Sequence, residues 1–509
     1  MLPWVVHRLR CLSIAREGWT HEIDMITGIL SFGAYIPKRR LQRSTIYAAN
    51  AWFAGNLKGL ARGERAIADW DKDAITMGVE AARDALIGID RTSISGVTLA
   101  STTFPFADRQ NAGIVKEALV LRDESGTMDV GGSMRVATSA LINAFRSSQA
   151  GAGPQLCVAS DMRKSRPASE AELLNGDAAA AVIVGQGAVI AQFLGSHSVS
   201  LDFVDHYRAS DSDFDYGWES RWVRDVGFHE VLVDALKQGM RTLDVGANEI
   251  ARLVIPIAVR GGATSVARKA GFKEEAVTDT LSLNVGDSGA AHPLLLLASV
   301  LERATPGEKI LLVGFGQGVD MILLEATERV RDLPARRGVA GSLARRREDS
   351  NYMRWLFHRG LIELEKGMRS ESDLRQPLTA LWRERKTVLG LVGGRCVQTG
   401  TVQFPRTGLS VNPNQHARYS QEDYPLADVR ARIVTYTADA LTYSPAPPLY
   451  YGLIDFDGGG RMKVEFADVE EDAIEVGREV AMMFRIRAID EQRKFKRYFW
   501  KAAPVVSEA

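Results

Sequence analysis

The chain has 509 residues, of which 46% are hydrophobic and 25% charged, so it is long enough for two to four domains with large buried cores. Lys plus Arg and Asp plus Glu both number 63, and this balance gives no overall basic field that would attract nucleic acid or an anionic membrane. No apolar run reaches the ~18 to 20 residues that a membrane span needs. We therefore expect neither nucleic acid nor a membrane as a partner.

The cysteine content is low, and it restricts the chemistry. Cys11, Cys157 and Cys396 are too few for a disulfide framework or a four-cysteine zinc site. A reducing, cytoplasmic setting is the expectation. Residues 1–24 lack the apolar stretch and cleavage site of a signal peptide, so they are predicted to be an extension of doubtful order, and translation could begin at Met25.

Residues 25–330 alternate strand-like apolar runs with amphipathic helical stretches, which is typical of layered α/β structure. The predicted strands include residues 97–102, 156–159, 180–185, 253–259 and 310–315, and a helix is predicted over residues 112–121. An internal repeat refines this prediction, because MDVGGS and LNVGDS align at a constant offset of 155 residues. Each copy precedes an apolar helix and a strand, so we predict two similar halves, about 25–190 and 191–330.

The pattern changes after residue 330. Residues 331–350 contain six arginines and few large apolar residues, which indicates an exposed connector, although such arginines could also bind a phosphorylated ligand. A helical stretch is predicted over residues 352–381, and the whole region 331–378 is taken as a basic and helical connector. From 379 to 505, short alternating strands with Gly and Pro turns favour a small all-β barrel.

Several motifs stand out in the first region: DKDAITMGVEAARDAL, STTFPFADRQNAGIVKEAL, DVGGSMRVATSAL, CVASDMRKSRPASEAELLNGDAAAAVIVG and NVGDSGAAHPLLLLASVLE with GFGQG. Together they resemble the thiolase superfamily, in particular its hydroxymethylglutaryl-CoA synthase-like branch. The C-terminal part, with GGRCVQTGTVQFP and TYTADALTYSPAPPLYYGLIDFDGGGRM, is similar to the OB-fold domain with a zinc ribbon that accompanies thiolase-like acyl-CoA enzymes. The resemblance implies a duplicated five-layer α/β domain followed by an OB-fold barrel.

The departures from this family are at its catalytic positions. Where the resemblance places an acylated cysteine, the sequence has Met134, whose thioether cannot be acylated to a usable intermediate. Pro256 or a neighbour stands at the position of the catalytic histidine, and Lys72 at that of the glutamate. The adjacent Ser133 is an alternative nucleophile. An acyl-cysteine mechanism is therefore not expected.

Other groups could still polarise a thioester. The resemblance places backbone oxyanion donors at Met134 and Gly316, and such a donor is worth about 3 kcal/mol of barrier. Asp287 is either a base in a partly desolvated pocket or a cap of the following helix. His292 either lines the same pocket or packs at the helix start.

The segment from residue 205 to 229 concentrates aromatic and charged side chains, which suits either a pocket wall or a dimer contact. Candidates for proton transfer there are His206, Tyr216 and His229, with Tyr207 as a further one. The predicted substrate-binding residues are Ser133, Arg135, Tyr207, Trp218 and Trp222.

The zinc ribbon is incomplete in sequence, because its pattern meets Cys396 but then Thr399, and the second pair falls near Ser410 and Asn414. We predict no zinc, no permanently bound cofactor, and coenzyme A only as part of the substrate. The first hypothesis is an aldol-type lyase acting on a 3-hydroxyacyl-CoA. The alternatives are a synthase or acyltransferase with a non-cysteine nucleophile, and a non-catalytic acyl-CoA-binding subunit. By analogy we expect a homodimer, with a larger assembly through the OB-fold domain as a further expectation.

Overall fold

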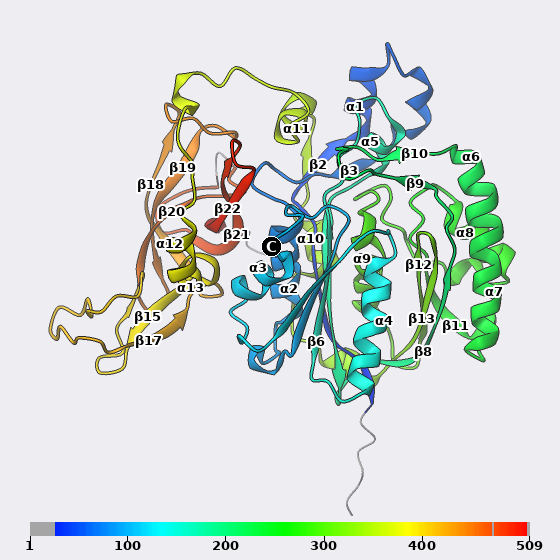
Figure 1. Ribbon diagram of the computed structural model, residues 1–509, viewed down its shortest axis with the longest axis horizontal. Helices are drawn as coiled ribbons and strands as arrows, with labels where there is room; N and C mark the ends of the chain where they lie inside the picture. The colour runs from blue at the N-terminus through cyan, green and yellow to red at the C-terminus, as the bar shows by residue number, and fades with distance from the viewer. Residues whose placement is uncertain (1–25, 471–472, 506–509) are drawn as a thin grey trace, which may run out of the picture.

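The computed structural model describes residues 26–470 and 473–505. The predictions for residues 1–24, Cys11 and Met25 lie outside the described residues. The larger region is built on one nine-stranded sheet (Figure 1). Its order is β11 (Ile250–Val254), β12 (Lys309–Phe315), β13 (Gly318–Ala326), β8 (Ala191–Ser200), β1 (Thr27–Tyr35), β7 (Ala178–Gln186), β6 (Gln155–Asp161), β4 (Gly96–Ala100) and β5 (Gly126–Val130).

The sheet confirms the predicted duplication. In the first half β1 pairs antiparallel with β7, β7 antiparallel with β6, and β6 parallel with β4. The second half repeats this pattern with β8, β13, β12 and β11. The halves meet where β1 and β8 pair through Gly28 and Ile29. A Cβ atom at Gly28 would lie 2.2 Å from the Ala191 carbonyl oxygen, so the seam requires glycine at this position.

Successive side chains of β6 and of β12 face different layers of the domain. Cys157 of β6 and Leu312 of β12 face the central layer formed by α4 (Val136–Gln149) and α9 (His292–Leu301). Leu156 packs in the outer layer with α2 (Ala74–Ala85) and α3 (Asn111–Ala118). Leu311 packs in the opposite outer layer with α7 (Val233–Thr242) and α8 (Gly262–Ala270). The five-layer arrangement follows from these three cores, as predicted.

The strand predicted over residues 253–259 is shorter in the structure. Strand β11 ends at Val254, and Pro256, which has no N–H to donate to the sheet, lies two residues further on. Before α7 the chain forms a short helix, α6 (Ser220–Trp222), and a π-helix over Val223–Leu232. The remaining elements around the sheet are α1 (Arg43–Asn50), β3 (Glu64–Ala66), α5 (Glu170–Leu174), β9 (His206–Tyr207) and β10 (Tyr216–Gly217).

The predicted exposed connector is instead packed against the α/β region. Helix α10 (Gly338–Ala344) begins where the Asp84 carboxylate accepts the Gly338 N–H at 2.9 Å. Strand β14 (Arg347–Asp349) then joins β2 (Arg39–Gln42) in parallel. Helix α11 covers only Tyr352–His358 rather than residues 352–381, because Gly360 and Gly367 adopt positive φ angles that end helical structure.

The C-terminal domain is all-β apart from two short helices, α12 (Leu378–Arg383) and α13 (Arg385–Gly390). A three-stranded sheet contains β15 (Val392–Cys396), β16 (Val402–Gln403) and β17 (Gln421–Pro425). A five-stranded antiparallel sheet has the order β20 (Arg461–Glu465), β19 (Leu449–Phe456), β18 (Ala431–Asp439), β21 (Glu479–Asp490) and β22 (Phe495–Pro504). Phe466, just after β20, bridges to Ala502 of β22 and so partly closes the barrel. The predicted all-β class of this domain is confirmed.

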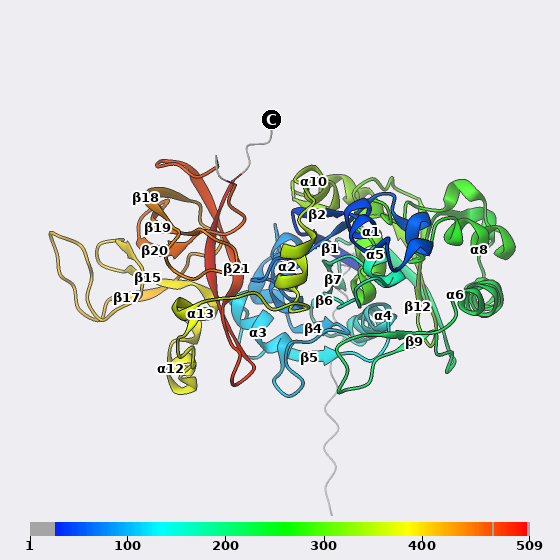
Figure 2. The ribbon, with the colours of Figure 1, turned by 90° about the horizontal axis from the view of Figure 1, so that it is seen from above.

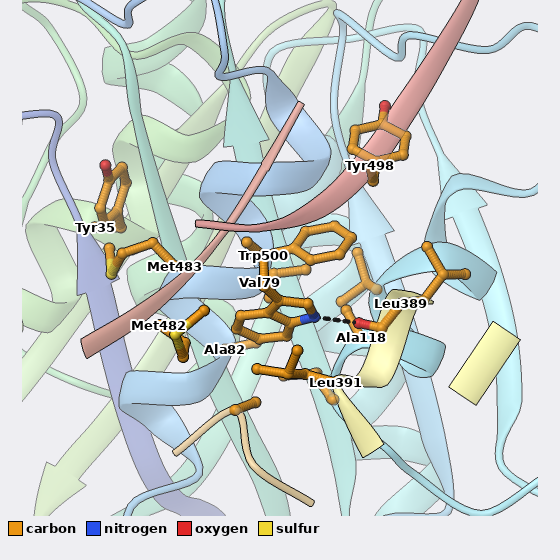
Figure 3. Close-up of a cluster of buried hydrophobic side chains, with 14 of the residues drawn as sticks. Tyr35, Val79, Ala82, Ala118, Leu389, Leu391, Met482, Met483, Tyr498 and Trp500 are labelled. Atoms are coloured by element: carbon orange, nitrogen blue, oxygen red, sulfur yellow. Dashed lines mark hydrogen bonds between the residues drawn. The ribbon is translucent and has the colours of Figure 1, made fainter. Parts of the chain in front are cut away.

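The two domains share one hydrophobic core. Strands β21 and β22 lie beside α2 and α3 when the molecule is seen from above (Figure 2). Trp500 of β22 is 1% exposed, and its indole N–H donates to the Leu389 carbonyl at 2.7 Å (Figure 3). Figure 3 also shows Val79 and Ala82 of α2 among the barrel side chains Met482 and Trp500. The barrel is therefore packed on the outer helical layer as part of a continuous interior.

Buried charges cross the same interface. Lys72 is 2% exposed, and its Nζ lies 3.0 Å from Asp69, 3.4 Å from Asp71 and 2.9 Å from Asp468 of the C-terminal domain. The second oxygen of Asp468 lies 3.0 Å from Arg485. Burial alone would raise the pKa of Asp468, but Lys72 and Arg485 hold it well below its usual range. Lys72 thus joins the domains through an ion-pair network.

Candidate functional site

The loops that carry most of the predicted site residues follow the carboxyl ends of β4, β5, β6 and β12. Strands β4, β5 and β6 are parallel, so their carboxyl ends lie at one edge of the sheet. The loop after β12 joins them because Ser133 and Arg135 both donate to the Gly316 carbonyl. The loops comprise residues 101–104, 131–135, 161–163 and 316–317, and residues 287–290 join them from the segment before α9. Gly131 reaches the first of these loops, since a Cβ atom there would lie 3.0 Å from the Ser101 carbonyl oxygen.

Asp161, at the end of β6, holds the loops together. Its carboxylate is fully buried and accepts five hydrogen bonds of 2.7 to 3.0 Å. Four come from the Ser101, Thr102 and Thr103 segment, and the fifth comes from the Ala290 N–H in the second half of the repeat. A buried carboxylate with this many donors is a rigid anchor. Asp161 was not among the residues predicted from the sequence.

Met134 lies just before helix α4, next to Gly316. A Cβ atom at Gly316 would lie 3.1 Å from both the Cβ and the amide nitrogen of Met134. Ser133 donates its hydroxyl to the Gly316 carbonyl at 2.7 Å, and the Arg135 Nε–H donates to the same oxygen at 3.0 Å. Ser133 is therefore held as a hydrogen-bond donor, and none of its contacts within the described residues is with a base.

Arg135, predicted to bind substrate, is instead engaged within the protein. Its guanidinium lies 2.8 Å from Asp320 and donates to Ser200 at 3.0 Å. The predicted pair of oxyanion donors is also corrected in part. The Gly316 N–H donates to the Gly318 carbonyl at 3.0 Å, whereas the Met134 N–H has no acceptor among the described residues. The Met134 amide, at the positive end of α4, is therefore a donor that remains free at this site among the described residues.

Asp287 acts as a cap in this structure. One of its oxygens accepts the Gly289 N–H at 2.9 Å, and the other lies 4.0 Å from Arg163. His292 is 1% exposed, with its Nδ1 lying 3.2 Å from the Ser288 hydroxyl. Burial lowers the pKa of His292, so the imidazole is neutral. Of the alternatives for these two residues, the structure favours capping for Asp287 and packing for His292.

Arg163 and Arg208 attach the aromatic segment to this edge of the sheet. Both guanidinium groups lie 2.8 Å from the Asp215 carboxylate. Arg208 also donates to the Thr102 carbonyl, beside the Asp161 anchor. The hairpin of β9 and β10 is therefore fixed to the same loops that surround Met134.

The hairpin forms a small aromatic pocket of about 230 Å³, lined by Val204, His206, Tyr207, Tyr216 and Trp218. The rings of Tyr207 and Tyr216 lie 5.4 Å apart. His206 Nδ1 lies 2.9 Å from the Asp205 carboxylate, which orients the imidazole in the manner of a catalytic dyad. Asp205 was not predicted as a site residue, although its position next to His206 in the sequence was a usable signal.

Two predicted members of this cluster lie elsewhere. His229, in the π-helix, pairs with the Ser265 hydroxyl of α8 at 3.1 Å. Trp222 stacks on Phe203 with ring centroids 4.3 Å apart, and Phe203 in turn contacts Phe315, which precedes Gly316. The prediction is corrected here: His229 and Trp222 pack behind the site rather than in the aromatic pocket.

The other expected departures also have defined surroundings. Lys72 is enclosed by three carboxylates at the domain interface. Cys157 is buried in the central core, and burial raises the pKa of its thiol to about 12. Within the part of the chain that the structure describes, Cys396 is the other thiol, and it lies in the C-terminal domain.

In the region that resembles a zinc ribbon, residues 396–420, the side chains near Cys396 form hydrogen bonds with one another. The Cys396 sulfur lies 3.2 Å from the Ser420 hydroxyl, and Thr399 donates to Thr401 at 3.0 Å. Asn412 donates to Thr401 at 2.8 Å. Across residues 26–470 and 473–505, no three His, Cys, Asp or Glu side chains converge as a metal site would require. In the same residues no helix is long and apolar enough to cross a membrane.

Comparison with known proteins agrees with this architecture. Residues 240–323 match the family model of the 3-oxoacyl-[acyl-carrier-protein] synthase III C terminus, and residues 424–485 match that of the ChsH2 C-terminal OB-fold domain. The chain thus combines a thiolase-like region with a C-terminal OB-fold domain. The thiolase-like region is similar in sequence to hydroxymethylglutaryl-CoA synthases.

Individual relatives cover mainly the first region. The hydroxymethylglutaryl-CoA synthase of Caldivirga maquilingensis is 27% identical over 355 residues, which are 67% of this chain and 100% of that protein. The synthase of Thermococcus onnurineus is 28% identical and covers 60% of this chain and 89% of its own length. The structure of MvaS in complex with 3-hydroxy-3-methylglutaryl coenzyme A has a TM-score of 0.57 at 19% identity, covering 67% of this chain and 92% of that one. FabH from Pseudomonas aeruginosa PAO1 has a TM-score of 0.53 at 21% identity, covering 60% and 99%.

Proposed function

We propose that this protein is an acyl-CoA-binding enzyme that cleaves or forms a carbon–carbon bond next to the thioester without an acyl-cysteine intermediate. The observation that carries the proposal is Met134 at the start of α4. In the described residues no thiol lies at this site, since Cys157 is in the core and Cys396 is in the OB-fold domain. The similarity to acyl-CoA-utilising synthases supports the substrate class.

The reaction we favour is an aldol-type cleavage of a 3-hydroxyacyl-CoA. A base removes the proton of the 3-hydroxyl group, the C2–C3 bond breaks, and C3 becomes a carbonyl. The electron pair of the broken bond passes to C2 and the thioester oxygen as an enolate. The proton taken from the hydroxyl returns to C2, which gives a shorter acyl-CoA and an aldehyde or ketone. The Met134 N–H at the helix start supports this step, because a preorganised donor stabilises the enolate oxygen.

His206 is the base we propose. The Asp205 carboxylate fixes its Nδ1 at 2.9 Å and leaves Nε2 available as an acceptor. Tyr207, Tyr216 and Trp218 supply the pocket wall on which an acyl group would lie. Asp287 is a weaker candidate, because its oxygens are engaged by Gly289 and Arg163.

The test is to incubate the full-length protein with a series of 3-hydroxyacyl-CoA thioesters and to follow CoA products by mass spectrometry. A shortened acyl-CoA with a matching carbonyl compound is expected. His206→Gln should lower kcat by about 100-fold or more, in the range of lost general-base catalysis. His229→Gln is the matched control, because it removes an imidazole that pairs with Ser265 instead.

Two results would contradict the proposal. An acyl mass increment on the protein after rapid mixing would indicate a covalent synthase or acyltransferase, with Ser133 as its first candidate nucleophile. Tight CoA binding without turnover of any thioester in the series would indicate a non-catalytic subunit. Equal losses in the His206 and His229 variants would remove His206 as the base.

A further inference from the structure

A small, partly open cavity lies where three parts of the chain meet. It is lined by Tyr35, Ile36 and Lys38 at the end of β1, by Arg337, Ser342 and Arg345 of the α10 segment, and by Asp468 and Met483 of the OB-fold domain. Its volume is about 10 Å³. This is room for about one water-sized particle. Tyr35 and Met483, which line it, lie beside each other in Figure 3.

Three side chains that line the cavity have buried donors without a partner. Ser342 is 2% exposed, and its hydroxyl has no hydrogen-bond partner among the described residues. The same holds for one terminal nitrogen of Arg337 and for Nε of Arg345. A buried donor left without an acceptor costs about 1–3 kcal/mol, and more when the group is charged. Three such donors around one cavity indicate a missing acceptor.

The charge around the cavity is positive. Lys38, Arg337 and Arg345 line it, and Asp468 is the one carboxylate among its lining residues. Both oxygens of Asp468 are already engaged, by Lys72 at 2.9 Å and by Arg485 at 3.0 Å. Burial lowers the pKa of Arg345, and the charge of Arg337 adds to this effect. Glu470 of the OB-fold domain pairs with Arg347 at 3.5 Å.

The occupant is constrained by both size and charge. A carboxylate or phosphate has several heavy atoms and is too large for a space of about 10 Å³. A water molecule would accept from these donors, but it is neutral and would leave the positive charge of the cavity uncompensated. A monatomic anion accepts from the same donors and offsets that charge.

We propose that this cavity binds a single halide ion, chloride under physiological conditions, which ties α10 to strand β1 and the OB-fold domain. The ion would act as a structural element of the domain interface. Because the cavity is separate from the Met134 loops, this assignment is independent of the proposed reaction.

Crystals of the full-length protein grown or soaked in sodium bromide provide the direct test. An anomalous difference peak is expected in the cavity, within hydrogen-bond distance of the Ser342 hydroxyl and Arg345 Nε. The peak should be absent in the double variant Ser342→Ala/Arg345→Met. A cavity that holds only water, or an empty one, in bromide crystals of the unaltered protein would overturn the proposal.

Thermal unfolding gives a solution test that does not require crystals. A ligand that binds only the folded state raises its stability, so replacing gluconate by chloride at constant ionic strength should raise the unfolding midpoint by about 2 °C or more. Arg345→Met should remove most of this shift. Arg331→Met, which removes an exposed arginine that pairs with Glu328, is the control and should retain it. Equal chloride shifts in both variants, or no shift in the unaltered protein, would contradict a chloride site.

Discussion

Asp468 is the residue on which the charged part of the domain interface depends. Replacing it with Asn removes the carboxylate that Lys72 and Arg485 share, at 2.9 Å and 3.0 Å. Both cations have side chains that are at most 1% exposed, so water cannot replace the lost partner. Removing one partner of a buried ion pair costs about 3–5 kcal/mol.

The remaining ion pairs place the expected loss of unfolding free energy at the lower end of that range. Lys72 keeps Asp69 at 3.0 Å and Asp71 at 3.4 Å, whereas Arg485 keeps only the more distant Glu80 carboxylate at 3.8 Å. We therefore expect Asp468→Asn to lower the free energy of unfolding by about 3 kcal/mol. Lys72→Met should have a similar effect, and the double variant should lose less than the sum, because the two residues interact directly.

The assay is urea unfolding of the full chain, followed by tryptophan fluorescence, since Trp70 and Trp500 both lie at this interface. The control is Lys496→Met, which removes a part-exposed partner of Asp73 at 3.2 Å and should cost less than about 1 kcal/mol. If Asp468→Asn costs no more than this control, the ion-pair network does not hold the domains together.

The stability difference between the unaltered protein and Asp468→Asn should depend on pH. The pKa of Asp468 is well below its usual range when folded, so its stabilising contribution is complete above the unfolded pKa and is lost as the pH falls. The stability difference between the unaltered protein and Asp468→Asn should therefore be constant from about pH 5 to 8 and narrow below about pH 4. A difference that narrows toward high pH would refute this assignment.

Three further predictions test other parts of the structure. Asp161→Asn places an amide among five hydrogen-bond donors, so it should lower the free energy of unfolding by about 3 kcal/mol and also lower turnover. Urea unfolding and product formation measure the two effects. A variant with unchanged stability and turnover would contradict the role of Asp161 as the loop anchor. Cys157→Ala should leave turnover unchanged. The native Cys157 thiol should resist alkylation at pH 8, because burial raises its pKa to about 12. Rapid labelling of Cys157, detected by mass spectrometry, would contradict this prediction. Trp500→Phe removes the hydrogen bond to Leu389 and should lower the free energy of unfolding by about 1 kcal/mol. Trp500→Ala also removes the buried ring and should lower it by about 3–5 kcal/mol. Equal losses in the two variants would indicate that packing of the ring contributes little.

The sequence predicted the duplicated α/β architecture because its signal is local and repeated. The loop, helix and strand of each half keep the same spacing, and this spacing survives as α4 with β6 and α9 with β12. The all-β class of the C-terminal domain was also predicted, since strands such as β18 and β20 alternate between buried and exposed side chains. Strand β22 carries less of this signal, because its second half, Trp500 to Pro504, is buried on both faces.

The site was predicted less completely, because its geometry depends on contacts between distant segments. Residues 206, 207, 216 and 218 do form one pocket, as their density in the sequence indicated. Spacing could not show that His229 turns toward Ser265 along a π-helix, or that Gly316 uses its N–H within its own turn. Nor could it show that Asp161 gathers loops from both halves, since Ala290 is 129 residues away in the chain.

The shared core also constrains how the protein is made. Helices α2 and α3 are synthesised early, but strand β22, which covers them, begins at Phe495, about 410 residues after the end of α2. At typical synthesis rates of about 5–20 residues per second, roughly 20 to 80 s pass between the synthesis of α2 and that of β22. Until then β22 cannot pack on the apolar face of these helices. During that interval the nascent chain exposes the hydrophobic surface shown in Figure 3. We expect the expression yield of soluble protein to depend on chaperones that shield this helical face until the last strand is available.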